Sequence, residues 1–360
     1  MRHLRVALMG VGAIGGELVR RAMDRPTVRF VALADRSGVI AEGEGFRRGE
    51  LARVLELKGS GGRLSDLQGG HERHASMLNV IREGEADALV DVTGADTFDL
   101  LYEALEHTHV VSSNKVPFAD SSYRMFRRLM ERAADMGRVL DIGTTAGAGM
   151  RVPDLLERLG CDGFQRVTGC LSGTMNYLSQ RVNEEKPLST ALREAMSPPR
   201  EYTEPDPRDD LGGEDFARKL VIIGRLCGSD VERGHVDVED MVPADLRDAR
   251  VEEFMDGLGG LDLAMKERVE AAHRAGNAVW YLGSADLENG VYTVGFEEVP
   301  RGDMIAGSRE SDNVVRFTPK GWRRPVTIMG PGAGPPETVT GLLAGLEAVN
   351  KQVTPRTPSC

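Results

Sequence analysis

In the first half of the chain, short apolar runs alternate with longer amphipathic stretches. Residues 4–9, 28–34, 86–93 and 109–113 are predicted strands, and residues 17–23 have the spacing of a helix. Alternation of strands and helices is typical of a parallel sheet with crossover helices. The pattern therefore predicts an α/β class, with a doubly wound parallel sheet in the N-terminal part.

The second half of the chain does not repeat this alternation. A strand-to-helix junction is predicted at residues 172–174, paired strands at 280–282 and 290–296, and a last strand at 325–329. A closing helix follows at residues 338–349. This order predicts a second domain of α+β type, after which the chain returns to the first domain.

Composition is that of an ordinary soluble globular protein, with 41% hydrophobic and 28% charged residues in 360. The net charge of −11, without a basic stripe, excludes nucleic acid as a partner. No apolar run is long enough to span a bilayer, so we expect no membrane partner and a cytoplasmic location. The four cysteines, which include Cys161 and Cys360, show no CxxC or metal spacing and agree with that location.

Gly10, Gly12 and Gly15 stand in GxGxxG spacing between the first strand and the first helix. In this context Gly10 permits a tight turn, Gly12 lets backbone approach a pyrophosphate, and Gly15 packs the helix against the strand. The N–H groups at the start of the helix, around Ala13 and Ile14, point toward the phosphates. We therefore predict a Rossmann domain that binds NAD or NADP.

Cofactor preference is open because two neighbouring residues give opposite signals. Asp35 ends the second strand, twenty residues after Gly15, where an acid usually binds the adenine ribose 2′-OH of NAD. Arg36 follows directly and is suited to the 2′-phosphate of NADP.

Three further polar residues follow predicted interior strands. Thr93 lies at the end of one strand, and Ser112 and Lys115 lie at the end of the next. Ligands of doubly wound sheets bind at the carboxyl edge, so we expect ligand contacts there. A solvated loop lysine is the alternative interpretation of Lys115.

One lysine lies on the apolar face of a predicted helix. The side chains of Phe216, Leu220 and Ile223 form an apolar arc. Lys219 falls inside that arc, and Asp215 lies one turn earlier. A lysine in an apolar interior is costly unless a carboxylate pairs with it, and such a pair in a cleft suits proton transfer. The alternative is a solvated i,i+4 pair, worth roughly 0.3 kcal/mol.

The predicted strand-to-helix junction at Ser172, Gly173 and Thr174 presents backbone N–H groups and a hydroxyl. Such a turn binds an anion, for example a carboxylate. N-capping of the helix by Ser172 or Thr174 explains the same residues. Both interpretations stay open.

Together these motifs resemble homoserine dehydrogenases, in order and over almost the whole length. The segments that carry the resemblance are residues 10–15, 112–115, 145–149, 172–177, 202–219, 311–315 and 330–334. The most specific is EPDPRDDLGGEDFARK, from Glu204 to Lys219. The resemblance implies the NAD(P)-dependent, reversible reduction of L-aspartate 4-semialdehyde to L-homoserine, in threonine and methionine biosynthesis. It also implies a monofunctional short form, without a fused kinase or an ACT domain.

The resemblance implies roles for single residues. Lys219 would transfer the proton, with Asp215 beside it and Lys115 as a second essential lysine. The implied substrate-binding residues are Glu204 and Asp210 for the ammonium group, with Thr174, Gly173 and Tyr202 nearby. In the last glycine turn, Gly334 would add to the cofactor site.

By the same resemblance, residues 1–145 and 325–360 form the dinucleotide-binding Rossmann domain. Residues 146–324 form the substrate-binding, catalytic and dimerisation domain. A homodimer or a dimer of dimers is implied, with the strands of Trp280 and Tyr292 as interface material. A Na⁺ or K⁺ ion is implied at the backbone carbonyls of Gly143, Ala146 and Ala148.

Two departures from the family pattern bear on the substrate. Met150 and Arg151 follow the hinge glycines where the family has Leu or Ile and then Pro, and Glu201 replaces a glycine. Arg151 is suited to recognise an additional anionic group or to cap a helix. The alternative function is a related oxidoreductase that acts on a different hydroxy or aldehyde amino acid in specialised metabolism.

Overall fold

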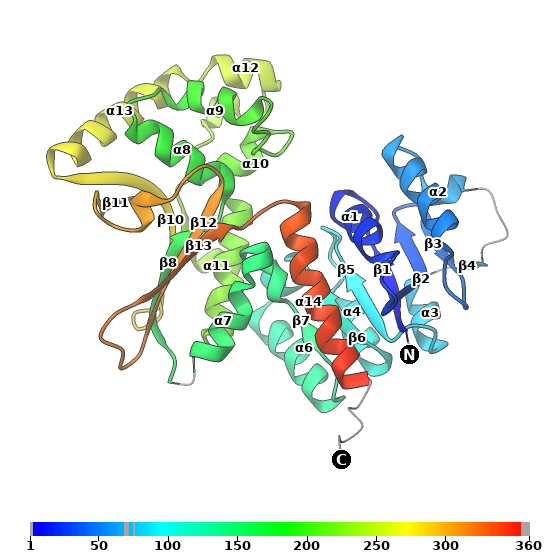
Figure 1. Ribbon diagram of the computed structural model, residues 1–360. Helices are drawn as coiled ribbons and strands as arrows, with labels where there is room; N and C mark the ends of the chain where they lie inside the picture. The colour runs from blue at the N-terminus through cyan, green and yellow to red at the C-terminus, as the bar shows by residue number, and fades with distance from the viewer. Residues whose placement is uncertain (1–2, 68–71, 75, 161, 354–360) are drawn as a thin grey trace. The chain divides into compact units, whose positions relative to one another are not determined.

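The computed structural model describes residues 3–67, 72–74, 76–160 and 162–353 (Figure 1). Cys161 and Cys360 lie outside these ranges. The chain forms two compact units, one made of residues 1–151 and 334–360 and the other of residues 152–333. Within the described ranges, no helix is both long and apolar enough to cross a membrane.

The first unit contains a seven-stranded sheet in the order β4-β3-β2-β1-β5-β6-β7. The five strands from β2 to β7 are parallel, as predicted, and end at one edge. β3 and β4 are added in antiparallel orientation and extend the sheet beyond the parallel part. The strands are β1 (Leu4–Met9), β2 (Val28–Asp35), β3 (Gly38–Ala41), β4 (Glu72–His74), β5 (Ala88–Asp91), β6 (His109–Ser112) and β7 (Leu140–Asp141).

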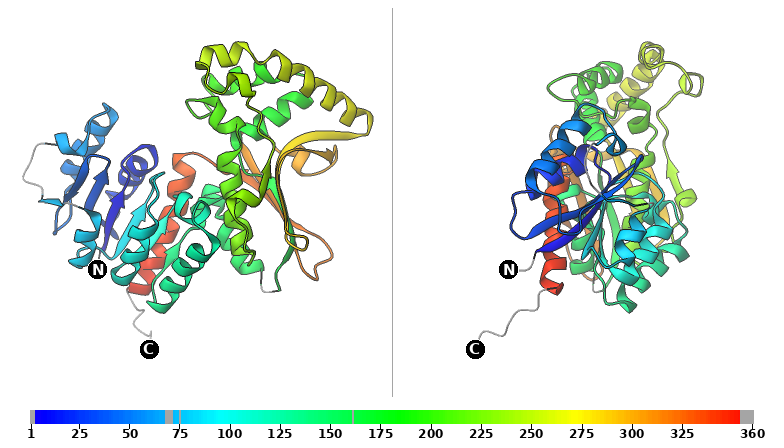
Figure 2. Two further views of the ribbon diagram at one scale, coloured as in Figure 1. Left: turned by 180° about the vertical axis from the view of Figure 1, so that it is seen from behind. Right: turned by 90° about the vertical axis from the view of Figure 1, so that its right-hand side faces the viewer.

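Helices lie on both faces of this sheet (Figures 1 and 2). α1 and α14 pack against each other on one face, and α4 packs against α3 and α6 on the other. The helices are α1 (Ala13–Ala22), α2 (Arg48–Gly59), α3 (Met77–Arg82), α4 (Phe98–His107), α5 (Val116–Ala119), α6 (Tyr123–Asp135) and α14 (Pro335–Val353). Three short 3₁₀ turns complete the unit, η1 (Leu64–Asp66), η2 (Gly143–Thr145) and η3 (Ala148–Met150).

The second unit contains a six-stranded sheet in the order β13-β12-β8-β10-β11-β9. All neighbours are antiparallel except β11 and β9. β10 is buried at every position except its two ends, because α8, α11 and α13 all pack against it. The strands are β8 (Phe164–Cys170), β9 (Val236–Val238), β10 (Asn277–Asp286), β11 (Val291–Pro300), β12 (Asp312–Pro319) and β13 (Val326–Pro331).

The helices of the second unit come mostly before its long hairpin of β10 and β11. They are α7 (Val152–Leu159), α8 (Gly173–Asn183), α9 (Leu188–Met196), α10 (Pro207–Leu211), α11 (Glu214–Leu226), α12 (Val251–Asp256) and α13 (Gly259–Arg274). The 3₁₀ turns are η4 (Arg233–His235), η5 (Ala244–Leu246) and η6 (Ile305–Gly307). Helices and strands do not alternate regularly here and the sheet is mainly antiparallel, so this unit is α+β. The expected fold class is confirmed.

The division of the chain differs from the expected boundaries at 145 and 325. The last predicted strand is β13, and it pairs with β12 in the second sheet rather than joining the first. The chain therefore re-enters the first unit only at Gly334, where α14 begins to form. An apolar run shows that a strand forms, but it does not show which sheet accepts it.

The C-terminal helix α14 completes the core of the first unit. Its apolar residues join the same buried cluster as β1, β2 and α1. The helix contributes Val339, Leu342, Leu343, Leu346 and Val349 to that cluster. Small residues allow this close approach, since a Cβ at Gly345 would lie 2.8 Å from the Asp141 carboxylate.

Candidate active site

The glycine turn between β1 and α1 has the geometry that a dinucleotide requires. Gly10 has φ +96°, a conformation that favours glycine. A Cβ at Gly15 would lie 1.8 Å from the Gly10 carbonyl oxygen, so only glycine lets α1 approach β1 this closely. A Cβ at Gly12 would meet no atom within 4 Å, which leaves this backbone open to a ligand. Ala13 and Ile14 form the first turn of α1 and direct its free N–H groups to the same place.

A cavity of about 910 Å³ lies beside this turn, inside the first unit. It is lined by Gly10 and Gly12 of the turn, by Asp35 at the end of β2, by Arg36 after it, and by Thr93 after β5. The structure therefore brings together five of the residues predicted for the cofactor. Lys58 and Arg63 also line the cavity, and sequence reasoning did not identify them.

The Asp35 carboxylate is already engaged by the protein. Its Oδ1 accepts hydrogen bonds from the backbone N–H and the hydroxyl of Ser37, and its Oδ2 accepts from Lys58 at 2.6 Å and from the Leu64 N–H. Burial alone would raise the pKa of Asp35, but these hydrogen bonds, with Lys58 the strongest, hold it at about 2. Asp35 is thus a permanent anion whose acceptor positions are filled.

A second polar cluster joins the carboxyl ends of β5 and β6. The Asp91 carboxylate is fully buried and accepts hydrogen bonds from the Thr93 N–H, from the hydroxyls of Thr93 and Thr97, and from the Asn114 amide. Asn114 also donates to the Ala95 carbonyl at 2.8 Å. These bonds fix the two loops that carry Thr93 and Lys115.

Ser112 and Lys115 lie at this edge of the sheet, as the strand pattern predicted. Ser112 is buried, and its hydroxyl donates to the Asp91 carbonyl and accepts from the Asn114 N–H. Lys115 caps α5 with its backbone and is half-buried. Gly334 lies at the start of α14 with φ +106° and accepts a hydrogen bond from the Thr338 N–H.

The loop after β7 carries the carbonyls predicted for a monovalent cation. Gly143 belongs to η2, Ala146 follows it, and Ala148 begins η3 with φ +43°. The Ala148 carbonyl accepts the Arg151 N–H at 3.1 Å, so one of the three carbonyls already has a protein donor. The ion stays a prediction.

Arg151 is held inside the first unit. Its guanidinium donates to the Asp141 carboxylate and to the Gly341 carbonyl, each at 2.6 Å, and its side chain is 16% exposed. These contacts tie η3 to α14. Arg151 therefore acts as an internal tie, and the suggested recognition of an additional anionic group finds no support in its geometry.

In the second unit, Lys219 lies on α11 with its ammonium group held at two points. Nζ is 2.8 Å from the Asp215 carboxylate and donates to the Leu171 carbonyl at 2.6 Å. The Lys219 side chain is only 13% exposed, whereas that of Asp215 is 50% exposed. A solvated surface pair would not place the lysine against a backbone carbonyl from the end of β8. The ammonium group is therefore oriented by two partners and mostly excluded from solvent.

The turn from β8 into α8 settles part of the N-capping question. The Ser172 hydroxyl accepts the Met175 N–H, so Ser172 caps α8. The Thr174 hydroxyl instead donates to the Tyr202 carbonyl at 2.7 Å. A Cβ at Gly173 would lie 2.9 Å from the Ser311 Cβ, so this position requires a residue without a side chain.

Asp210 and Glu204 form an acidic site next to this turn. The Asp210 carboxylate accepts the Glu204 N–H at 2.8 Å and also interacts with the Thr174 hydroxyl. Burial, and secondarily the negative charges of Glu204 and Asp215, raise the pKa of Asp210 to about 6.

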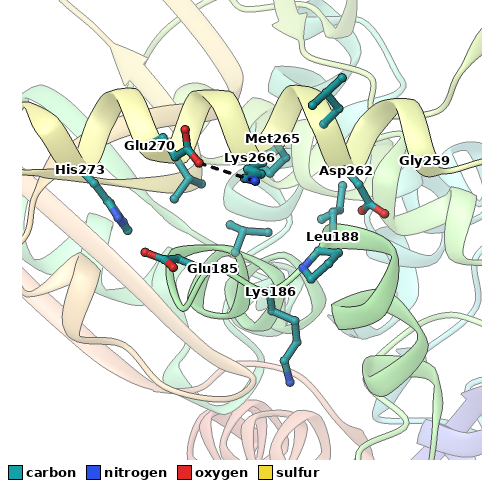
Figure 3. A pocket seen from close by; sticks show the side chains of 13 residues that line it. Glu185, Lys186, Leu188, Gly259, Asp262, Met265, Lys266, Glu270 and His273 are labelled. Carbon is teal, nitrogen blue, oxygen red and sulfur yellow. Dashed lines mark ion pairs between the residues drawn. The ribbon is translucent and has the colours of Figure 1, made fainter.

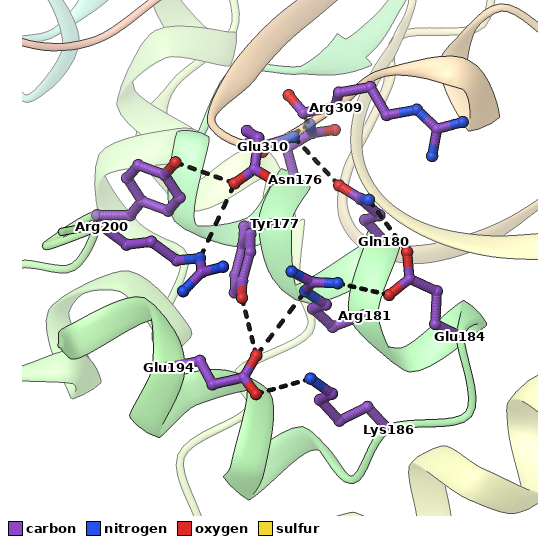
Figure 4. A network of polar contacts seen from close by, with 11 residues as sticks. Asn176, Tyr177, Gln180, Arg181, Glu184, Lys186, Glu194, Arg200, Arg309 and Glu310 are labelled. Atoms are coloured by element: carbon purple, nitrogen blue, oxygen red, sulfur yellow. Dashed lines mark hydrogen bonds and ion pairs between the residues drawn. The ribbon is translucent and has the colours of Figure 1, made fainter. Parts of the chain in front are cut away.

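Tyr202 is held by a network that joins α8, α9 and the loop before β12 (Figure 4). Its hydroxyl donates to Glu310 at 3.0 Å, and its ring meets Tyr177 edge-on at 5.4 Å between centroids. Tyr177 in turn donates to Glu194 and has the guanidinium group of Arg200 over its ring. The network fixes the backbone of the Tyr202–Glu204 segment, and none of its partners was predicted.

A separate pocket of about 520 Å³ lies between α13 and the turn from α8 to α9 (Figure 3). It is lined by the apolar residues Val182, Leu188 and Met265 and by Lys266, which pairs with Glu270. None of the predicted site residues lines it. The predicted substrate residues Gly173 and Thr174 lie at the opposite end of α8.

The two units together define a nicotinamide-dependent oxidoreductase. The first has the glycine turn, open backbone and cavity of a dinucleotide site, and the second has a mostly buried lysine paired with a carboxylate. Within the described ranges, no group of three or more His, Cys, Asp or Glu side chains is arranged to hold a metal ion.

Comparison with known proteins identifies the family. The sequence model of the homoserine dehydrogenase family matches residues 153–346. A homoserine dehydrogenase of Schizosaccharomyces pombe is 28% identical over 98% of this chain and 96% of its own length. One of Paracoccidioides brasiliensis is 33% identical over 72% of each chain. A mutant hyperthermophilic archaeal homoserine dehydrogenase, solved in complex with NADPH, has the same fold, with a TM-score of 0.74, 21% identity and 98% of each chain covered.

The chain belongs to the homoserine dehydrogenase family. The expected homoserine dehydrogenase activity and its dependence on NAD or NADP are thereby confirmed at the level of the family, whereas the alternative substrate gains no support. The roles of individual residues are argued below.

Replacing the buried carboxylate at the sheet edge tests whether it organises this edge. In Asp91→Ala, four donors lose their acceptor, and we expect a loss of about 3 kcal/mol in the free energy of unfolding. Chemical denaturation measures it. Asp99→Ala, an exposed acid in the first turn of α4, is the matched control and should cost less than about 0.5 kcal/mol. Equal losses in the two variants would contradict the assigned role.

Proposed function

We propose that the second unit binds the amino-acid substrate and transfers the proton, and that the first unit binds NADP in preference to NAD. The observation that carries the first part is the ammonium group of Lys219, buried between the Asp215 carboxylate and the Leu171 carbonyl. The observation that carries the second is the set of cations around Asp35.

Lys219 is the proposed proton-transfer residue. An ammonium group has three N–H donors, and two of them are directed to Asp215 and Leu171, which leaves one for the substrate oxygen. When the bound nicotinamide supplies a hydride to the aldehyde carbon, negative charge develops on that oxygen. The remaining Lys219 N–H stabilises this charge and delivers the proton, and in the oxidative direction it takes the proton back. Asp215 is a positioning residue that holds the Lys219 ammonium group in place through the ion pair.

Glu204 and Asp210 are the proposed acceptors for the substrate ammonium. Asp210 has a raised pKa because it is partly desolvated among other acids. An incoming ammonium group relieves this repulsion, so part of the binding free energy comes from removing an unfavourable arrangement. Thr174, Gly173 and Tyr202 shape the turn that borders the acidic site. Lys115 is proposed as a second ligand-contacting lysine, presented by the Asn114 cluster.

The preference for NADP rests on charge in the cavity of the first unit. Three cations, Arg36, Lys58 and Arg63, line it together with a single carboxylate. Since that carboxylate already accepts four hydrogen bonds, a ribose 2′-OH finds no vacant acceptor there. A 2′-phosphate instead gains ion pairs with the cations.

Self-association is proposed through the hairpin of β12 and β13. Trp322 in its turn is 50% exposed, and Met329 on the edge strand β13 is 38% exposed. Trp280 and Tyr292 are unsuitable as interface side chains, because both are buried within the unit and Trp280 donates to Asn176. The homodimer or dimer of dimers and the cytoplasmic location stay predictions.

Removing the Lys219 ammonium tests the mechanism. In Lys219→Ala we expect kcat for L-homoserine oxidation to fall by roughly 10²- to 10⁴-fold, with the KM for NADP unchanged, because general acid–base catalysis contributes a factor of that order. Lys266→Ala is the matched control, since Lys266 also forms an i,i+4 pair with a glutamate but lies on α13. Unchanged turnover in Lys219→Ala would refute the proposed role.

The pKa of Asp210 predicts how substrate binding varies with pH. Because this pKa is raised above the unfolded value, folding favours the protonated acid, and that stabilisation is lost as pH rises through about 6. Binding of the ammonium requires the ionised form, so the KM for L-homoserine should rise as pH falls below about 6. In Asp210→Asn the KM should be high and lack this pH dependence. Steady-state kinetics from pH 5 to 8 measures both, and an identical pH profile in the variant would contradict the assignment.

Lys58→Ala tests the cofactor preference. We expect kcat/KM for NADP to fall roughly tenfold or more, through loss of a phosphate contact worth about 1–3 kcal/mol. In the same variant, kcat/KM for NAD should stay unchanged or rise, because Asp35 regains a vacant acceptor for the ribose hydroxyl. Arg20→Ala, a surface arginine paired with Glu17 outside the cavity, is the control. A wild-type preference for NAD, or a ratio unchanged in Lys58→Ala, would overturn the proposal.

A further inference from the structure

Asn313, at the start of β12, has a buried side-chain carbonyl without a donor. The residue is 0% exposed, and its Oδ1 accepts no hydrogen bond within the described ranges. Leaving a buried acceptor unpaired typically costs about 1–3 kcal/mol. Such an atom in a native fold calls for an explanation, and a bound ligand or water is the usual one.

The orientation of the Asn313 amide is fixed by its other end. Its Nδ2 donates to the Gly332 carbonyl at 3.2 Å. The amide packs against Gly332 so closely that a Cβ there would lie 2.2 Å from the Asn313 Cγ. Rotating the amide by half a turn would bring two carbonyl oxygens together. The unpaired atom is therefore the oxygen, and the site offers an acceptor rather than a donor.

The strand register places Asn313 next to the end of β8, which carries the carbonyl that holds Lys219. Val314 pairs with Cys170 in the antiparallel ladder of β12 and β8, so Asn313 is level with Leu171. The Leu171 carbonyl is the one that accepts the Lys219 ammonium. Two residues before Asn313, Ser311 packs against Gly173, next to Thr174.

We infer that Oδ1 of Asn313 accepts a hydrogen bond from the α-ammonium group of the bound amino-acid substrate. An ammonium group has three N–H donors, and the carboxylates of Glu204 and Asp210 provide partners for two. Asn313 supplies the third acceptor, which is neutral and adds no further repulsion among the acids. This inference rests on the proposed function and adds a substrate-recognition residue to it.

Two substitutions at this position separate the acceptor from the rest of the side chain. Asn313→Leu has similar volume and no acceptor, and we expect it to raise the KM for L-homoserine roughly tenfold while the KM for NADP stays within about twofold. Asn313→Asp keeps an acceptor oxygen but loses the donor to Gly332, and we expect a KM for L-homoserine within about threefold of wild type. If the leucine variant does not fold, Asn313→Ala takes its place.

A ligand without the ammonium group tests the identity of the donor. 4-Hydroxybutyrate has the carbon chain, carboxylate and hydroxyl of L-homoserine but no amino group. We expect its inhibition constant against L-homoserine to be the same for wild type and Asn313→Leu. An equal loss with both compounds would overturn the inference, and so would an increase confined to the KM for NADP.

Asn183→Leu is the matched control for a purely structural asparagine. Asn183 lies in the same unit, and its Oδ1 accepts the Val279 N–H while its Nδ2 donates to the Val279 carbonyl. This control should lower the melting temperature without changing the KM for L-homoserine. If Asn313→Leu behaves likewise, Oδ1 of Asn313 holds only a water molecule and the inference is wrong. Loss of turnover in Lys219→Ala would still stand in that case, so failure of the inference is distinguishable from failure of the proposed function.

Discussion

The burial of one ammonium group on an otherwise apolar helix is the constraint around which the second unit is organised. A charge at Lys219 is tolerated only because a carboxylate one turn earlier and a backbone carbonyl at the end of β8 lie within hydrogen-bond distance. The carbonyl is in place because β8 runs between β10 and β12. The end of β8, the start of α8 and the first turn of α11 are thereby held near one another. Gly173 and Thr174 belong to the start of α8, and Asp210 interacts with the Thr174 hydroxyl.

A similar logic governs the first unit, with the sign of the charge reversed. The Asp91 carboxyl group is buried at the carboxyl end of β5, and the side chains that donate hydrogen bonds to it belong to the loops that follow β5 and β6. Asp35 is an anion, kept ionised by Lys58 and by backbone N–H groups. In the first unit, the loop geometry therefore depends on carboxylates that are held by the protein's own donors, whereas in the second unit Lys219 is held by the protein and is also proposed to contact the substrate.

The sequence predicted the elements with a strong local signal. GxGxxG in a strand–turn–helix context predicted the glycine turn, and the helical spacing of Lys219 within an apolar arc predicted its burial and its partner. Local signals did not reveal contacts between residues far apart in the chain. Lys58 against Asp35, Glu310 against Tyr202 and β13 beside β12 depend on tertiary packing, which no periodicity encodes. Arg151 shows the same limit, since its sequence context suggested a ligand and its partner is Asp141.

The route of the chain has a consequence for how the protein is made. Residues 152–333 form one uninterrupted unit, whereas the other unit closes its core only with α14 from the last part of the chain. During synthesis from the N-terminus, the inserted unit is complete in sequence before the surrounding one is. The N-terminal sheet therefore exposes apolar surface until Val339 to Val349 have been synthesised, and during that interval this surface is open to chaperones and to misassembly.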